Sequence, residues 1–220
     1  MNRIANLFLD WLRSWLVAMG IAPNMITSSR LVLAPIALLF QQLGGNWLFF
    51  CLIAIVAAEI SDALDGWLAK TTDRITPFGN LFDPAADTGF HITMFCGFIG
   101  SGWMPWWFLP IFYWRDLLST LLRAYIAAEH HEAMKARPWG KRKTASQGAV
   151  QIITVALYLI VPLTPFRLVF PTREICIGLM VCSLVITIIS AVDYAYHGIQ
   201  DYRKLKAKSS AAQVSETIPA

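Results

Sequence analysis

Four aspartates stand in two closely spaced pairs within an otherwise apolar part of the chain. Asp62 and Asp65 are three residues apart, and Asp83 and Asp87 are four apart, so each pair shares one face of a helix. The sequence TPFGN between the pairs predicts a turn that brings both pairs to one depth. Carboxylates crowded at low dielectric repel one another unless cations neutralise them, and all-oxygen ligands favour hard divalent ions. The spacing therefore predicts a site for Mg²⁺ or Mn²⁺.

Small and cationic residues accompany these aspartates. Gly66 and Ala69 leave the acidic face open to a bulky anionic ligand, and Gly79 allows a close turn where the next helix begins. Lys70 is placed to meet phosphate charge, and metal ions beside a phosphate favour displacement at phosphorus. The alternative is a purely structural role, with Asp83 as a helix N-cap before a proline. Four carboxylates on two facing helix ends favour the functional interpretation.

The chain that carries these residues is too apolar for an ordinary soluble domain. Of its 220 residues, 56% are hydrophobic and 15% are charged, and its net charge is +4. The basic residues lie mostly in short segments between apolar runs, so we expect no nucleic-acid partner. Six stretches are long enough to cross a bilayer as helices: about 24–43, 46–70, 82–101, 105–133, 144–161 and 174–202. The predicted fold is an all-α integral membrane protein with six transmembrane helices.

Three regions divide the chain. Residues 1–22 separate polar from apolar side chains on a helical wheel and predict an N-terminal amphipathic interfacial helix. Residues 23–203 hold the six spans as one domain, and residues 204–220 form a small, polar tail that we expect to be disordered. Lys and Arg gather at both ends of the chain and beside the aspartates. The positive-inside rule therefore places the termini and the aspartates in the cytoplasm.

Further basic residues occur within the spans and at the start of the fifth span. Arg115 and Arg123 are eight residues apart, about 80° around a helix, so both can line one broad cavity. Lys141 and Lys143 stand at the predicted entrance to the fifth helix. These four cations suit an acceptor that carries its own phosphate. For the lysines, positive-inside topology is the alternative explanation.

Polar residues also open the first predicted span. Asn24 and Thr27 can cap its helix, while Arg30 lies about two turns inside, where an unpaired charge is costly. We expect Arg30 to pair with Glu59 or Asp62, or to line the cavity.

The segment DALDGWLAK at 62–70, with Gly79, Asp83 and Asp87 at matching spacing, resembles the signature of the CDP-alcohol phosphotransferases. The family pattern is DxxDGxxAR(x8)GxxxDxxxD, and the chain departs from it at Lys70, where the family has arginine. Lysine keeps the charge but loses the planar two-pronged donor. The segment PNMITSSR at 23–30 resembles the opening of the family's first helix. The resemblance implies six transmembrane helices, a homodimer and two divalent metal ions.

The resemblance also implies a role for each matching residue. Asp62, Asp65 and Asp83 would be metal ligands, and Asp87 would be both a metal ligand and the general base. The residues implied or expected to bind CDP-diacylglycerol are Gly66, Ala69, Lys70, Gly79, Asn24 and Thr27. The implied reaction joins an alcohol to the phosphatidyl group of the CDP-linked lipid and releases CMP. It takes place at the cytoplasmic face of the membrane, and the resemblance implies a bacterial inner membrane.

The acceptor alcohol is indicated by a second set of residues. The pair Arg115-Asp116, an arginine eight residues later and the segment GKRKTASQ at 140–147 resemble the phosphatidylglycerophosphate synthases, whose acceptor is sn-glycerol 3-phosphate. The residues expected to bind its phosphate are Arg115, Arg123, Lys141 and Lys143. Phosphatidylglycerol, inositol phosphate and serine remain alternative acceptors. A divalent-cation transporter is the alternative from a different class.

Two residues near Asp87 are left outside the predicted site. Thr88 stands where many such synthases have lysine, and its helical position turns it away from the Asp83 and Asp87 side chains. His91 lies one turn beyond Asp87 and could tune that carboxylate, but a lone histidine is more often a packed polar residue.

Overall fold

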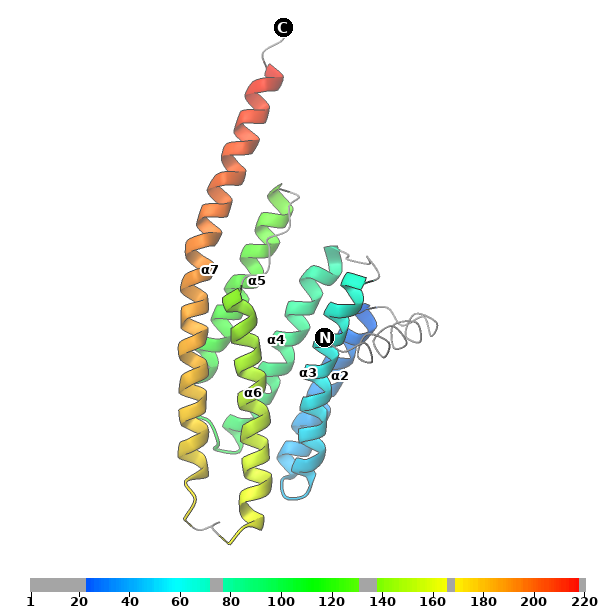
Figure 1. Ribbon diagram of the computed structural model, residues 1–220, viewed down its shortest axis with the longest axis vertical. Helices are drawn as coiled ribbons and strands as arrows, with labels where there is room; N and C mark the ends of the chain where they lie inside the picture. The colour runs from blue at the N-terminus through cyan, green and yellow to red at the C-terminus, as the bar shows by residue number, and fades with distance from the viewer. Residues whose placement is uncertain (1–22, 72–76, 131–137, 166–168, 218–220) are drawn as a thin grey trace, which may run out of the picture.

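The computed structural model describes residues 23–71, 77–130, 138–165 and 169–217 (Figure 1). These residues form six α-helices and one short 3₁₀-helix, and none of them is in a strand. In chain order the elements are α2 (Pro23–Leu43), α3 (Trp47–Thr71), α4 (Pro77–Gly100), α5 (Phe108–His130), α6 (Pro138–Ile160), η1 (Val161–Leu163) and α7 (Thr172–Thr217). The predicted all-α class is confirmed. The amphipathic helix predicted for residues 1–22 lies outside the described part of the chain.

Two helices begin earlier than the apolar runs predict. Helix α4 begins at Pro77 and α6 at Pro138. Proline is favoured in the first turn of a helix because its missing N–H would have no helical partner there. The turn predicted at TPFGN is therefore wrong from Pro77 onward, since Gly79 lies in the first turn of α4. Lys141 and Lys143 lie in the first two turns of α6, at the start of the fifth predicted span.

The last helix continues further than predicted. Helix α7 has 46 residues and ends at Thr217, within the segment expected to be a disordered tail. The sequence KLKAKSSAAQ at 204–213 is rich in good helix formers, and lengthening an existing helix requires no new nucleation. Figure 1 shows this part of α7 projecting beyond the other helices.

The helices pack in two groups. Helix α2 contacts both α3 and α4, and α7 contacts both α5 and α6 (Figure 1). Contacts of α3 with α6 and of α4 with α5 join the groups. The centre of the core is aromatic, and the rings of Phe95 on α4 and Phe112 on α5 stack with centroids 4.9 Å apart. Helix α4 is thereby held between the other helices, with its acidic first half at one end of the bundle.

The connections between the helices reach two opposite ends of the bundle. The described ends of α3 and α5 and the start of α4 lie toward the end from which α7 projects (Figure 1). At the opposite end, α2 and α3 are joined by a tight turn in which Gly44 and Gly45 have φ angles of 65° and 53°. Glycine adopts these left-handed angles without steric cost.

The outer surface of the bundle is apolar. Within the described residues, three helical segments are long and apolar enough to cross a membrane: Met25–Leu43, Pro138–Leu163 and Thr172–Gln200. Large side chains such as Leu39, Leu118 and Val192 are more than half exposed on these and neighbouring helices. An exposed apolar surface of this extent suits lipid and not water. The chain is therefore an integral membrane protein.

Candidate active site

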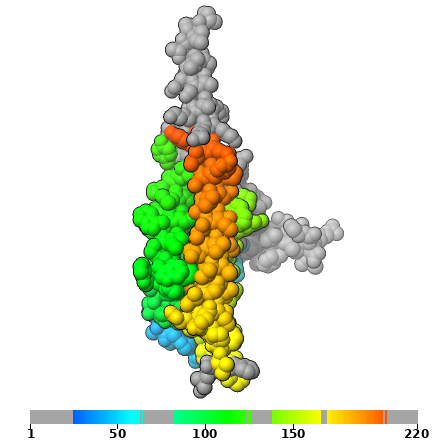
Figure 2. Space-filling view, turned by 90° about the vertical axis from the view of Figure 1, so that its left-hand side faces the viewer, coloured from blue at the N-terminus to red at the C-terminus, as the bar shows by residue number. Residues whose placement is uncertain are grey.

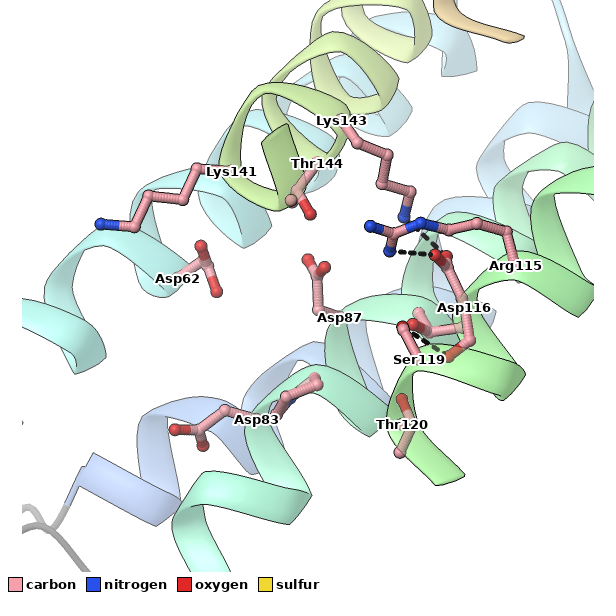
Figure 3. A pocket seen from close by; sticks show the side chains of 13 residues that line it. Asp62, Asp83, Asp87, Arg115, Asp116, Ser119, Thr120, Lys141, Lys143 and Thr144 are labelled. Carbon is pink, nitrogen blue, oxygen red and sulfur yellow. Dashed lines mark hydrogen bonds and ion pairs between the residues drawn. The ribbon is translucent and has the colours of Figure 1, made fainter. Parts of the chain in front are cut away.

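A pocket of about 210 Å³ lies between α3, α4, α5 and α6 (Figure 3). It contains most of the predicted polar residues whose side chains are described: Asp62, Asp83, Asp87, Arg115, Lys141 and Lys143. Its other lining residues are Pro84, Thr88, Asp116, Ser119, Thr120, Gly140 and Thr144. The fold thus brings acidic groups from α3 and α4 to face basic groups from α5 and α6.

We call Asp62, Asp83 and Asp87 the carboxylate wall, and helix α2 supports it from behind. Nη1 of Arg30 donates a hydrogen bond to Oδ1 of Asp62 at 2.7 Å and lies 3.7 Å from Oδ1 of Asp87. The hydroxyl of Thr27 donates to Oδ1 of Asp83 at 2.8 Å. Arg30 is almost fully buried, so its charge is directed at these carboxylates and not at solvent. One of the two expected partners of Arg30, Asp62, is confirmed.

The capping roles considered for this region are not the ones that the structure shows. Helix α2 begins at Pro23, so Asn24 and Thr27 lie inside it, and Thr27 bonds to Asp83 on another helix. Asp83 lies in the second turn of α4, so it does not cap that helix. Pro84 lies in the same turn, beyond the first turn of α4, so it cannot donate the i→i−4 hydrogen bond of a regular helix.

We call Arg115, Lys141 and Lys143, together with Asp116, the cationic wall. Nζ of Lys143 donates to Oδ2 of Asp116 at 2.6 Å, and Nη1 of Arg115 donates to Oδ1 of the same residue at 3.0 Å. Arg115 also donates to the hydroxyl of Ser190 on α7. Lys143 and Asp116 are almost fully buried, whereas Lys141 is exposed. One carboxylate therefore holds two buried cations at the edge of the pocket.

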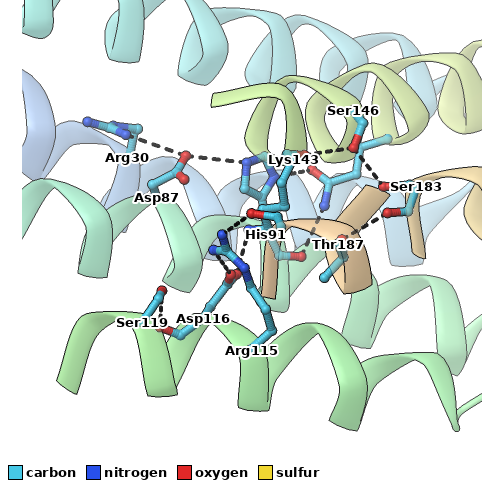
Figure 4. Close-up of polar contacts among 12 residues, drawn as sticks. Arg30, Asp87, His91, Arg115, Asp116, Ser119, Lys143, Ser146, Ser183 and Thr187 are labelled. Carbon is cyan, nitrogen blue, oxygen red and sulfur yellow. Dashed lines mark hydrogen bonds and ion pairs between the residues drawn. The ribbon is translucent and has the colours of Figure 1, made fainter. Parts of the chain in front are cut away.

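Three polar residues that were not predicted as part of the site contact or line it. Asp116 joins the two buried cations, and its only sequence signal was its position directly after Arg115. His91, which we left outside the site, has Nε2 3.3 Å from Oδ1 of Asp87 (Figure 4). Its signal was the four-residue spacing from Asp87. Thr88, also left outside the site, lines the pocket.

The side chains of several predicted residues lie outside the described part of the structure. Asp65, Gly66, Ala69 and Lys70 belong to the last two turns of α3, directly after Asp62. The same applies to Asn24 in α2, Gly79 in α4 and Arg123 in α5. Their roles remain predictions.

The carboxylate wall has the donor chemistry of a divalent-cation site. Its three acidic side chains offer only oxygen, and the side chains of Asp62 and Asp87 are 45% and 18% exposed toward the pocket. Among the described residues, no group of three or more His, Cys, Asp or Glu side chains is close enough to form a metal site. Asp65, the fourth predicted ligand, is not among those side chains. The residues present fit hard cations by chemistry.

An apolar groove of about 360 Å³ lies between α5 and α7, which run beside each other on the face shown in Figure 2. Its lining residues are Arg115, Leu118, Ser119, Leu122, Ala191, Val192, Tyr194 and Ala195. Arg115 and Ser119 also line the polar pocket, so the two cavities share one part of α5. The guanidinium of Arg115 lies 5.8 Å from the ring centroid of Tyr194.

Comparison with known proteins adds an independent finding. Residues 20–192 match the family described as CDP-alcohol phosphatidyltransferase. A Mycobacterium tuberculosis protein named "Probable phosphatidylglycerophosphate synthase" is 29% identical over 196 residues, which cover 85% of this chain and 86% of that protein. A Pseudomonas fluorescens CDP-diacylglycerol–glycerol-3-phosphate 3-phosphatidyltransferase is 32% identical over 143 residues, or 61% of this chain and 71% of the relative. A proposed cardiolipin synthase of Mycobacterium bovis is 33% identical over 96 residues, 44% of this chain and 46% of the relative.

Proposed function

Because the chain belongs to the CDP-alcohol phosphatidyltransferase family, we propose that it transfers the phosphatidyl group of CDP-diacylglycerol to sn-glycerol 3-phosphate and releases CMP. The names of the mycobacterial and pseudomonad relatives support this acceptor. The observation that carries the proposal is the pocket itself, in which carboxylates of α3 and α4 face cations of α5 and α6. Because the chain belongs to a family of enzymes, we prefer this function to the alternative of a divalent-cation transporter.

The carboxylate wall is the donor side of this proposal. Members of the family generally use divalent metal ions. Asp62, Asp65, Asp83 and Asp87 would hold two of them, Mg²⁺ or Mn²⁺, since these ions prefer carboxylate oxygen. When bound, they neutralise pyrophosphate charge and stabilise the leaving oxygen. Helix α2 supports this side, because Arg30 and Thr27 fix two of the four carboxylates.

The transfer reaction needs a general base, and the carboxylate wall supplies it. Asp87 takes the proton from the C1 hydroxyl of glycerol 3-phosphate, and the hydroxyl oxygen attacks the β-phosphorus of CDP-diacylglycerol. A new P–O bond forms to the glycerol, the P–O bond to CMP breaks, and CMP leaves. Gly66, Ala69, Gly79 and Lys70 would surround the nucleotide phosphates, with Asn24 and Thr27 nearby.

The cationic wall is the acceptor side. Arg115 and Lys143 are held by Asp116 before any ligand binds, so they need little reorganisation to meet the phosphate of glycerol 3-phosphate. Lys141 adds an exposed charge at the same pocket, and Arg123 would extend it along α5. Several cations at this position suit a second anion beside the donor pyrophosphate.

The surroundings of the site complete the proposal. All six helices α2 to α7 would cross a bacterial inner membrane, with the pocket at its cytoplasmic face and residues 1–22 at the interface. The apolar surface and the bacterial relatives support this placement. CDP-diacylglycerol would enter from the surrounding membrane lipid, and the enzyme would act as a homodimer.

A lipid acceptor such as phosphatidylglycerol is the second candidate. The apolar groove between α5 and α7 favours it, because the groove reaches Arg115 on the acceptor side of the pocket. The match to a proposed cardiolipin synthase agrees with this alternative. Against it, the buried cations of the acceptor side suit an acceptor that is itself a phosphate monoester.

Purified protein in detergent micelles can decide between these acceptors. Labelled CDP-diacylglycerol would be supplied with Mg²⁺ and with glycerol 3-phosphate, phosphatidylglycerol, inositol phosphate or serine in separate reactions. We expect CMP and labelled phosphatidylglycerophosphate with glycerol 3-phosphate alone. Efficient cardiolipin formation would establish the second candidate instead. If no alcohol yields CMP, the proposed function is wrong.

A further inference from the structure

His91 occupies a buried position between the catalytic pocket and helix α6. It lies one turn after Asp87 on α4 and is 1% exposed. Its Nδ1 lies 3.0 Å from Oε1 of Gln151, a fully buried residue of α6. Nε2 of Gln151 donates a hydrogen bond to the backbone carbonyl of His91 at 3.0 Å. The two residues are therefore joined by a reciprocal pair of contacts.

This pair of contacts fixes the orientation of the imidazole ring. Because the amide nitrogen of Gln151 donates to a carbonyl, its amide oxygen must be the atom that faces Nδ1, and Nδ1 donates to it. The other ring nitrogen, Nε2, is then turned toward Oδ1 of Asp87 at 3.3 Å and Oε1 of Glu59 at 3.8 Å. Nε2 makes no hydrogen bond within the described part of the chain, so it is turned toward these two carboxylates without another partner there.

Asp87 is held from two sides at the same oxygen. Nη1 of Arg30 lies 3.7 Å from its Oδ1, and Nε2 of His91 lies 3.3 Å from that same atom. In both contacts Oδ1 is the atom of Asp87 to which the distance is measured. A carboxylate fixed at one oxygen by groups on two helices presents its second oxygen in a defined direction, which is the requirement for a base that must reach one hydroxyl.

We propose that His91 is a positioning residue for Asp87, and that Gln151 sets the ring through which His91 acts. This inference rests on the proposed function, in which Asp87 is the general base. His91 and Gln151 would keep Oδ1 engaged and Oδ2 directed toward the acceptor hydroxyl. Neither residue touches substrate, so both act on turnover and not on substrate binding.

A double-mutant cycle on the full-length protein tests the proposal. We expect His91→Leu to lower kcat by about 10- to 100-fold, the usual range for residues that orient a functional group. Gln151→Leu should lower kcat by about 10-fold, with both KM values changed less than about two-fold. Because Gln151 acts through His91, the double variant should be no slower than His91→Leu alone. His91→Gln, which keeps an N–H for Asp87, should recover part of the loss.

Gln147→Leu is the matched control. Gln147 lies one turn before Gln151 on the same helix, is 1% exposed, and neither amide atom has a hydrogen-bond partner among the described residues. The same substitution there should leave kcat within about two-fold of wild type, since it removes no such bond. Thermal midpoints of all variants in detergent separate unfolding from slow turnover.

Several results of these measurements would overturn the positioning role of His91. A multiplicative double variant, or a His91→Leu enzyme with normal kcat, would overturn the positioning role. A fall in kcat for Gln147→Leu equal to that of Gln151→Leu would do the same, because it would show a general packing effect. If the Leu variants do not fold, the folded His91→Gln variant is compared with wild type. A kcat for His91→Gln that is lowered by about 10- to 100-fold, the full loss expected of His91→Leu, would count against the positioning role. An inactive wild type would instead refute the proposed function.

Discussion

The two walls of the pocket are built in opposite ways. On the carboxylate wall, the side chain of Asp62 is 45% exposed and that of Asp87 is 18% exposed, and their support comes from behind, through Arg30. On the cationic wall, the side chains of Lys143 and Asp116 are only 2% and 4% exposed. The acids are thus left open to ligands that arrive as cations, whereas the bases are already neutralised in part by a buried acid. The first wall is therefore the one with carboxylate charge directed at the pocket, and the second is the one with its charges paired internally.

Removing a charge from the carboxylate wall should have the largest effect. Asp87→Asn deletes both the proposed base and a proposed metal ligand, and we expect kcat to fall by at least about 10³-fold. CMP release from CDP-diacylglycerol with glycerol 3-phosphate measures it. Asp193→Asn is the matched control, because Asp193 pairs with His197 on α7 and does not line the pocket. Substantial residual activity in Asp87→Asn would remove Asp87 from the role of base.

An Asp-to-Asn substitution on the cationic wall should lower both the stability of the protein and its affinity for the acceptor. Asp116→Asn leaves Lys143 buried without its counterion, which typically costs about 3–5 kcal/mol. We expect a lower thermal midpoint in detergent and a KM for glycerol 3-phosphate raised by about 10-fold or more, with Asp116→Glu intermediate. An unchanged midpoint together with an unchanged KM would show that the buried ion pairs are not what organises this wall.

The contrast between the walls also explains what the sequence could predict. The aspartates were found because spacings of three and four residues report which side chains share a helical face. The pairing of Arg30 with Asp62 was expected because an arginine inside an apolar span needs a carboxylate. Both inferences use local or compulsory rules, and the structure agrees with them where it describes the residues.

The contacts that were missed depend on the packing of distant helices. His91 and Gln151 are 60 residues apart, and Asp116 and Lys143 are 27 apart. No spacing rule links such pairs, because their distance is set by how α4, α5 and α6 pack. The early starts of α4 and α6 were missed for a different reason, since a proline that ends one helix can also begin the next.

A smaller effect on stability is expected where α3, which carries part of the carboxylate wall, packs against α6, which carries part of the cationic wall. Gly148 on α6 packs against α3, and a Cβ added there would overlap the carboxylate of Glu59. This carboxylate is the end of a flexible side chain and can move aside, so Gly148→Ala should destabilise the protein by no more than about 1 kcal/mol. Gly178→Ala on α7 is the control, since an added Cβ there meets nothing within 4 Å. It should stabilise by about 0.5–1 kcal/mol, because alanine is the better helix former. Thermal midpoints that shift in the same direction for both variants would contradict the close packing of α3 and α6.

The smallest effect should come from the exposed member of the cationic wall. Lys141 lines the pocket but is exposed, so its attraction to a phosphate is screened by solvent and is worth about 0.2–1 kcal/mol. Lys141→Gln should raise the KM for glycerol 3-phosphate by about two- to five-fold, leave kcat unchanged and reduce the salt dependence of KM. Its neighbour Arg142, whose guanidinium lies 4.8 Å from the ring centroid of Trp139 and does not line the pocket, supplies the control Arg142→Gln. Equal effects of the two substitutions would show that the lysine acts only through the general positive potential of this end of α6, and the cationic wall would then reduce to its buried pair.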